Sequence, residues 1–152
     1  MFRVIAAVVL GIAMAPLQAA VIGKEVSYQT GDTVMKGYLA YDDAVTGKRP
    51  GVLVVHEWWG HNSYARKRTE MLAELGYTAL ALDMYGDGKT ADHPDNAGKF
   101  ATAVRQDQDM MQARFNAARH YLNTHETVDP EQNAAIGYCF GGSVVLSVAR
   151  SG

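Results

Sequence analysis

The chain has 152 residues, of which 48% are hydrophobic and 20% charged, and its formal net charge at pH 7 is −2. This composition is that of a globular domain with its own hydrophobic core and argues against a disordered chain. The charge is close to neutral and no basic cluster is longer than Arg66-Lys67-Arg68, so nucleic acid is not an expected partner.

The first twenty residues have the pattern of a secretory signal peptide. Arg3 precedes an apolar run from Val4 to Ala15, and small residues up to Ala20 suit a cleavage site. The run is shorter than the roughly 20 apolar residues that span a bilayer. We therefore expect an exported protein, periplasmic or secreted, with no stable membrane anchor after cleavage; an uncleaved tether is the alternative. The domain would then occupy residues 21–152.

Two β segments and a buried strand open this domain. Residues 24–28 and 34–41 predict a hairpin around Thr30-Gly31-Asp32, and residues 42–50 predict a polar loop. The short apolar run of residues 51–56 is rich in β-branched side chains, as in a strand that is covered on both faces. It indicates a parallel, buried sheet.

Helices and strands alternate from that strand onward. Their spacing predicts a helix from Asn62 or Ser63 to Leu75, a strand over 78–82, a helix from Pro94, a longer helix to about Leu122, a strand over 133–137 and a helix from Gly141. Met111, Phe115, Ala118 and Leu122 form a stripe typical of core packing rather than of a cofactor site. The alternation predicts an α/β architecture with a mostly parallel sheet and flanking helices. We expect no cofactor.

The only cysteine of the chain, Cys139, lies between Gly137 and Gly141-Gly142, where a strand passes into a helix. This is the spacing of a nucleophile elbow, a strained turn that needs small residues because backbone segments come close together. The helix dipole would favour a thiolate, and the N–H of Phe140 would point toward a developing oxyanion. A lone cysteine can also be a small buried apolar residue or pair between molecules. The glycine spacing favours the nucleophile.

A second polar group, the segment His56-Glu57-Trp58-Trp59-Gly60-His61, follows the first buried strand. Its histidines are five residues apart instead of four and it leaves a strand, so it does not match the zinc motif H-E-x-x-H and we expect no metal. Open α/β sheets bind ligands at the carboxyl ends of their strands. We expect Glu57 to direct its carboxylate at the nucleophile and the Trp58 N–H to be a second oxyanion donor. A salt-bridged or capping role for Glu57, and simple packing of the tryptophans, are the alternatives.

Aromatic residues would line the same cleft. Trp58 and Trp59 cannot both point into one core from an extended backbone, so one should face the cleft, and we assign Trp59 to the substrate pocket. Tyr85, in the loop after the next buried strand, would be a second pocket residue, although such loops are often only turns. The histidines outside these segments are expected at the surface: His93, His120 and His125.

With the motifs G-Y-C-F-G-G, H-E-W-W-G and D-M-Y-G, the chain resembles the dienelactone hydrolase family of α/β-hydrolases, also called carboxymethylenebutenolidases, from about Val26 to its end. The resemblance implies the α/β-hydrolase fold and a Cys-His-Asp triad that opens small-molecule esters or lactones through an acyl-enzyme. It assigns Cys139 as the nucleophile and Glu57 as the carboxylate that contacts the resting thiol and assists its deprotonation. Backbone N–H groups of Trp58 and Phe140 would form the oxyanion hole.

Two departures from the family pattern narrow this expectation. Members that cleave dienelactone carry an arginine shortly after D-x-Y to hold the substrate carboxylate, whereas this chain has Asp87 at that place. An acid there would repel an anionic lactone, so we expect esters in general rather than dienelactone as substrates. The family's triad Asp and His are expected beyond Gly152, so the domain is expected to be incomplete at its carboxyl end, with the strand ending at Gly137 at a sheet edge. We therefore expect these 152 residues alone to be poorly stable and inactive in turnover.

Two other functions stay open on the sequence alone. The chain could belong to a non-catalytic α/β-hydrolase-like binding protein that retains only the shape of the pocket. A thiol-redox role is less favoured, because no second cysteine forms a C-x-x-C pair with Cys139.

Overall fold

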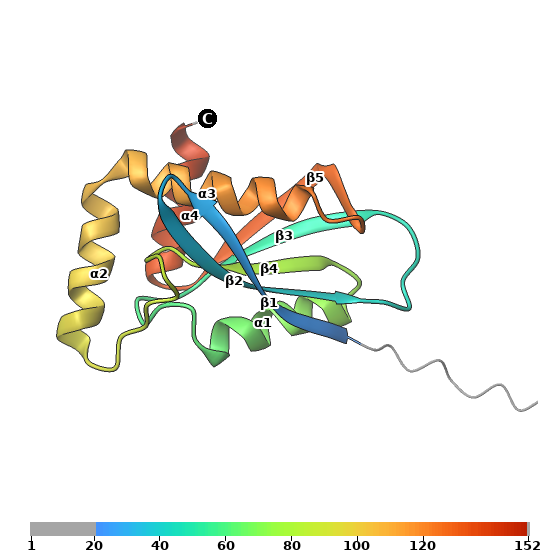
Figure 1. Ribbon diagram of the computed structural model, residues 1–152, viewed down its shortest axis with the longest axis horizontal. Coiled ribbons are helices and arrows are strands. Elements are labelled where there is room, and N and C mark those ends of the chain that lie inside the picture. The colour runs from blue at the N-terminus through green and yellow to red at the C-terminus, as the bar shows by residue number, and fades with distance from the viewer. Residues whose placement is uncertain (1–20, 152) are drawn as a thin grey trace, which may run out of the picture.

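The computed structural model describes residues 21–151, and over this range five strands form one mixed sheet with helices on both faces (Figure 1). The strands are β1 (Val21–Thr30), β2 (Thr33–Asp42), β3 (Arg49–Val55), β4 (Thr78–Leu82) and β5 (Val128–Gly137). The helices are α1 (Ser63–Glu74), α2 (Pro94–Gln106), α3 (Gln108–Asn123) and α4 (Phe140–Ser151). The predicted signal peptide, residues 1–20, lies outside the described residues. No helix within residues 21–151 combines the length and apolar character that a membrane span requires.

The sheet combines the predicted hairpin with the predicted parallel strands. The strand order is β1-β2-β4-β3-β5, in which β2 pairs antiparallel with both β1 and β4. The strands β4, β3 and β5 are parallel to one another, with Leu53 of β3 opposite Leu80 and Ala135. Parallel pairing places the carboxyl ends of these three strands on one side of the sheet, and the segments that follow them meet there.

The hydrophobic core lies between the sheet and the helices. The predicted stripe of α3 is buried and packs with residues of β2, β3 and β4 in the main cluster: Met111, Phe115, Ala118 and Leu122. The opposite face is covered by α1, with a smaller cluster of Val54, Ala65 and Ala81. Residues 52–55 of β3 are at most 4% exposed, because helices cover both faces of this strand.

The strand β5 lies at an edge of the described sheet and is longer than the predicted strand over residues 133–137. It begins at Val128, but its pairing with β3 jumps from Asp129 opposite Pro50 to Asn133 opposite Gly51. The intervening residues 130–132 therefore bulge out of the ladder, since Pro130 has no N–H to donate. Asp129-Pro130 thus lies at an irregularity inside the strand, and the strand starts before the predicted first residue, Asn133.

The predicted polar loop over residues 42–50 is also shorter than expected, because β3 already begins at Arg49. The Arg49 side chain is buried, and its guanidinium donates to the carbonyl oxygens of Asp42 at 2.8 Å and Val45 at 2.5 Å. These bonds close the loop against the start of the strand.

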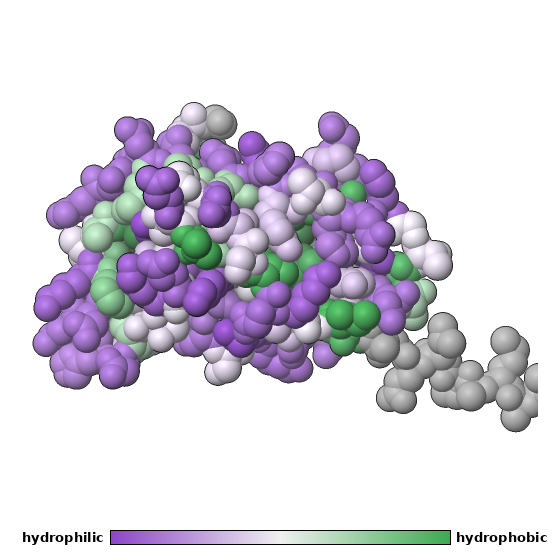
Figure 2. All heavy atoms as spheres, in the orientation of Figure 1, coloured by the Kyte–Doolittle hydropathy of each residue, from purple (hydrophilic) through white to green (hydrophobic). Residues whose placement is uncertain are grey.

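The surface in the view of Figure 2 is mostly hydrophilic, with hydrophobic residues scattered between charged ones. Among the described residues, the most exposed large hydrophobic side chains are Leu75 at the end of α1 and Leu146 on α4, at 75% and 56%. Single exposed apolar residues of this kind are ordinary on a globular surface.

Candidate active site

Cys139 forms the turn between β5 and α4, with an exposed thiol. Its φ is +53°, in the left-handed region that non-glycine residues rarely adopt. A Cβ atom at Gly137 would collide with the backbone of Gly141 and Gly142, and one at Gly141 with the carbonyl oxygens of the residues at the end of β3. The chain therefore makes a tight strand-to-helix turn that requires both glycines and presents the thiol at the first turn of α4.

Two unpaired backbone N–H groups occur close to this turn. Within the described part of the chain, neither the Phe140 nor the Trp58 N–H has a hydrogen-bond acceptor. The Tyr138 N–H donates to the Val55 carbonyl at 3.3 Å, so the segment after β3 lies beside the turn after β5. The two N–H groups are thus free to bind an oxygen atom near Cys139.

Glu57 is half-buried in the segment after β3. Within residues 21–151 its carboxylate forms no hydrogen bond or ion pair, so it has neither the salt-bridge nor the capping partner of the alternative interpretations. Within the same residues, no hydrogen bond joins the Glu57 carboxylate to the Cys139 thiol either. Its role toward the thiol therefore stays a prediction.

The aromatic residues of the two segments form one cluster. Tyr85 is only 5% exposed; its ring centroid lies 5.6 Å from that of Phe140, and its hydroxyl donates to the Trp58 carbonyl at 2.9 Å. Burial raises the pKa of the Tyr85 phenol far above its usual value, so the hydroxyl stays a donor. The rings of Trp58 and Trp59 contact each other at 5.1 Å, and both side chains are half-buried. The structure thus joins Trp58, Tyr85 and Phe140 in one cluster, and Trp59 packs on Trp58.

His56 also belongs to this site, although the sequence assigned it no role. The imidazole is 1% exposed; its Nδ1 lies 2.5 Å from the Glu57 carbonyl oxygen, and its Nε2 accepts from the Met84 N–H at 3.2 Å. Burial lowers the pKa of His56 below its usual value, so the ring is neutral. The sequence signal that could have indicated this role is a polar residue directly after a strand that is buried on both faces.

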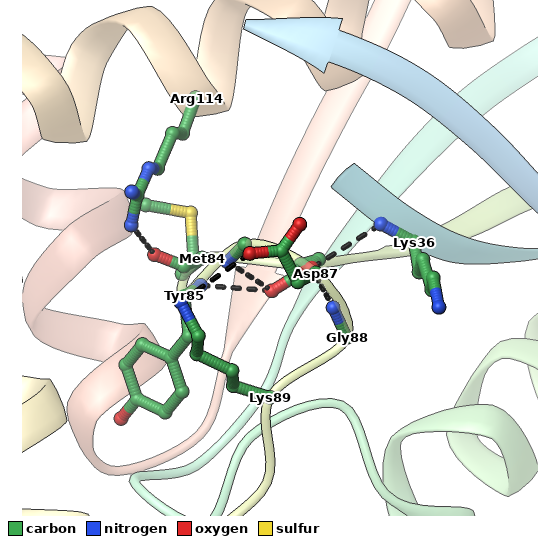
Figure 3. Close-up of polar contacts among 9 residues, drawn as sticks. Lys36, Met84, Tyr85, Asp87, Gly88, Lys89 and Arg114 are labelled. Atoms are coloured by element: carbon green, nitrogen blue, oxygen red, sulfur yellow. Dashed lines mark hydrogen bonds and ion pairs between the residues drawn. The ribbon is translucent and has the colours of Figure 1, made fainter. Parts of the chain in front are cut away.

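A second residue without an assigned role, Asp83, organises the loop that carries Tyr85. Its fully buried carboxylate accepts four backbone N–H groups, drawn in Figure 3: Lys36 at 3.2 Å, Tyr85 at 2.8 Å, Gly86 at 2.9 Å and Gly88 at 2.8 Å. The Arg114 guanidinium donates to the Met84 carbonyl at 2.7 Å from the other side of the loop. An aspartate followed by glycines in a turn was the available signal.

Asp87 lies in the same loop, where Figure 3 draws its side chain together with Lys89. Its exposed carboxylate forms an ion pair with Lys89 at 3.4 Å. This pairing reduces the negative charge that Asp87 was expected to present to an anionic substrate.

Of two hollows in the surface, one lies away from these groups and the other borders Tyr85. One of about 440 Å³ lies between α3 and the start of β5 and is lined by Arg119, Glu131 and Asn133, at the opposite end of the strand from Cys139. Another, of about 230 Å³, borders Tyr85 and Phe100. Within residues 21–151, no three His, Cys, Asp or Glu side chains are grouped as metal ligands.

Comparisons with known proteins agree with this geometry. The family model described as "Dienelactone hydrolase family" matches residues 35–152. The chain is 34% identical to "Protein usf" of Aquifex pyrophilus and 31% identical to a "Putative carboxymethylenebutenolidase" of Aquifex aeolicus; each match covers 84% of this chain and 55% of the relative. A solved dienelactone hydrolase-like promiscuous phosphotriesterase from metagenomic libraries is similar with a TM-score of 0.83 and 36% identity, over 87% of this chain and 55% of the other. The chain therefore spans about half the length of the curated relatives that it matches.

Proposed function

The chain belongs to the dienelactone hydrolase family, and from that premise we propose that it provides the nucleophile and the oxyanion hole of a hydrolase that cleaves carboxylic ester or lactone bonds. The observation that carries the proposal is the exposed Cys139 thiol, held in a left-handed turn at the start of α4. Strain of this kind is found at functional residues, because only a surrounding structure that requires the turn maintains it.

The proposed chemistry is acyl transfer to sulfur. The Cys139 thiolate attacks the carbonyl carbon of the ester, and the π electrons of the carbonyl move onto its oxygen. The Trp58 and Phe140 N–H groups, which lack acceptors within the described residues, bind this oxyanion. When the carbonyl re-forms, the C–O bond to the leaving group breaks, the leaving alkoxide takes a proton from water, and a thioester remains on Cys139. Hydrolysis of the thioester by water releases the carboxylic acid and restores the thiol.

We assign the thiol proton to Glu57. Its carboxylate is half-buried and without a partner within the described residues, in the segment beside the turn of Cys139. A carboxylate that accepts the proton as substrate binds leaves the thiolate that attack requires. The proposed substrates are small esters or lactones, with no requirement for an anionic group.

Release of p-nitrophenol from p-nitrophenyl acetate tests the nucleophile. We expect one equivalent to be released, at a rate about 100-fold above that of N-acetylcysteine at the same pH, because each oxyanion donor contributes on that scale. The Cys139→Ala variant should lose this release. Equal release from both proteins would refute the proposal.

The assignment of Glu57 has a separate test. Glu57→Gln should slow the acylation of Cys139 by about 100-fold or more, as expected for loss of a general base, while Glu131→Gln, an exposed glutamate of β5, should not. If the two variants show the same dependence of acylation rate on pH as the parent chain, Glu57 is not the base.

We also propose export, on the basis of the basic and apolar pattern of residues 1–20. The protein recovered from the periplasm of a bacterial host should begin near Val21. Recovery of the chain from the cytoplasm with residues 1–20 intact would contradict this.

A further inference from the structure

We infer that His56 is a positioning residue that fixes the Glu57–Trp58 peptide with its N–H toward Cys139, and so keeps the oxyanion hole formed. The inference rests on the proposed acyl transfer at Cys139 and assigns a role to a buried imidazole that the reaction itself does not use.

The hydrogen bonds of His56 determine its protonation state. A carbonyl oxygen can only accept, so the nitrogen bound to the Glu57 carbonyl, Nδ1, carries the proton. A backbone N–H can only donate, so the nitrogen facing Met84, Nε2, is unprotonated. The ring is therefore a neutral Nδ1–H tautomer, and full burial favours the neutral form.

This tautomer controls the direction of one peptide group. In a planar trans peptide the C=O and the N–H point in opposite directions. The Glu57 carbonyl accepts from His56 Nδ1 and from the Gly60 N–H at 3.2 Å, so the Trp58 N–H of the same peptide is directed away from both donors. That N–H has no acceptor within the described residues, and its segment lies beside the turn of Cys139.

The next peptide along the chain is held as well. The Tyr85 hydroxyl donates to the Trp58 carbonyl at 2.9 Å, so Trp58 is fixed on both sides. His56 also joins the two loops of the site, because Met84 precedes Tyr85. If the Glu57–Trp58 peptide flipped, the buried Nδ1–H would lose its acceptor and the Glu57 carbonyl would point at the position of the oxyanion.

Simple packing is the competing explanation. The imidazole stacks on Phe140 at 5.8 Å and meets the Tyr85 ring at 4.8 Å, so its removal could loosen the cluster without any effect on the peptide. A test must therefore measure oxyanion stabilisation separately from folding and from thiol reactivity.

Two reactions of Cys139 make that separation. Acylation by p-nitrophenyl acetate passes through an oxyanion, whereas alkylation by iodoacetamide displaces iodide at a saturated carbon and forms none. The ratio of the two rates reports the oxyanion hole, and changes in thiol exposure or ionisation largely cancel in it.

Two substitutions at His56 each keep one of its two hydrogen bonds and remove the other. In His56→Asn the side-chain amide nitrogen lies near the place of Nδ1 and can still donate to Glu57. In His56→Gln the amide oxygen reaches the place of Nε2 and can accept from Met84, but the donor to Glu57 is lost. We expect the ratio to fall about 100-fold in His56→Gln and to stay within about threefold of the parent value in His56→Asn, on the scale of one oxyanion donor.

His61→Gln is the matched control. His61 is a buried histidine of the same segment whose Nε2 has no partner within the described residues, so its replacement perturbs packing but not the Glu57–Trp58 peptide. The ratio should be unchanged in this variant. Melting followed by circular dichroism should accompany every variant.

An unchanged ratio in His56→Gln, or equal losses in His56→Gln and His56→Asn, would overturn the inference. If the His56 variants fail to fold, ¹⁵N-histidine NMR of the unsubstituted chain tests the inference instead. A neutral Nδ1–H tautomer of His56 at pH 7 supports the inference, and an Nε2–H tautomer overturns it. Absence of any acylation of Cys139 in the parent chain would instead refute the proposed function, so the two failures are distinguishable.

Discussion

Replacement of the buried Asp83 by asparagine should strongly destabilise the fold. The Asp83 carboxylate is fully buried and accepts four backbone N–H groups at 2.8 to 3.2 Å. Asparagine keeps one acceptor oxygen, so two of these N–H groups would face an NH₂ donor. At about 1.5–3 kcal/mol for each hydrogen bond to a charged group, the loss is about 3–6 kcal/mol. The lower cost of burying an amide offsets part of it, which leaves about 2–4 kcal/mol.

Urea denaturation followed by tryptophan fluorescence measures this loss, because Trp58 contacts Tyr85 in the loop that Asp83 holds. The control is Asp87→Asn in the same loop, where the carboxylate is exposed and paired only with Lys89. It should cost less than about 1 kcal/mol, as for exposed ion pairs. If Asp83→Asn costs no more than Asp87→Asn, the four hydrogen bonds do not hold the loop in solution and the reasoning is wrong.

Three further predictions concern stability. Cys139→Gly should leave the free energy of unfolding unchanged or raise it by up to about 1 kcal/mol, because glycine adopts a positive φ without strain. The control Ala103→Gly in α2 should lower the free energy of unfolding by about 1 kcal/mol. If both variants lose the same stability in urea titrations, the turn at Cys139 is not strained. Burial lowers the pKa of His61 from 6.5 to about 4, so as pH falls the unfolded chain binds a proton at His61 before the folded chain does. The contribution of His61 to the free energy of unfolding is complete above pH 6.5 and should fall by up to about 3 kcal/mol toward pH 4. His61→Leu should remove this contribution to the pH dependence of stability, and an unaltered pH dependence would contradict the assignment. Asn62→Ala should cost about 1 kcal/mol and Asn62→Asp much less, since the Asn62 oxygen accepts two N–H groups at the start of α1; equal melting temperatures of the two variants would refute the capping role.

Much of the fold could be predicted because its signals are local. The apolar runs of β3 and β4, the stripe of α3 and the glycines after α1 and around Cys139 each depend on a few neighbouring residues, and the structure places these elements where they were expected. The predicted start of β5 was wrong, because the strand also pairs with β3 on the other side of a bulge. Such a bulge depends on a partner strand that is distant in the sequence.

The supporting residues of the site could not be predicted in the same way. Cys139, Trp58 and Phe140 were predicted as site residues from their positions at strand and helix ends, and their roles stay predictions. The roles of His56 and Asp83 depend on hydrogen bonds to Met84 and Lys36, which only the sheet brings close. A sequence pattern shows that a polar residue follows a buried strand, but not which backbone group it meets.

The mass of the chain after reaction with p-nitrophenyl acetate tests the central claim most directly. A thioester at Cys139 predicts a mass increase of one acetyl group, located by peptide mapping on the segment that contains Gly137 to Gly142. The label should disappear in Cys139→Ala and be released by hydroxylamine, as a thioester is. Acetyl groups only on lysine side chains, or a chain of unchanged mass, would contradict the account.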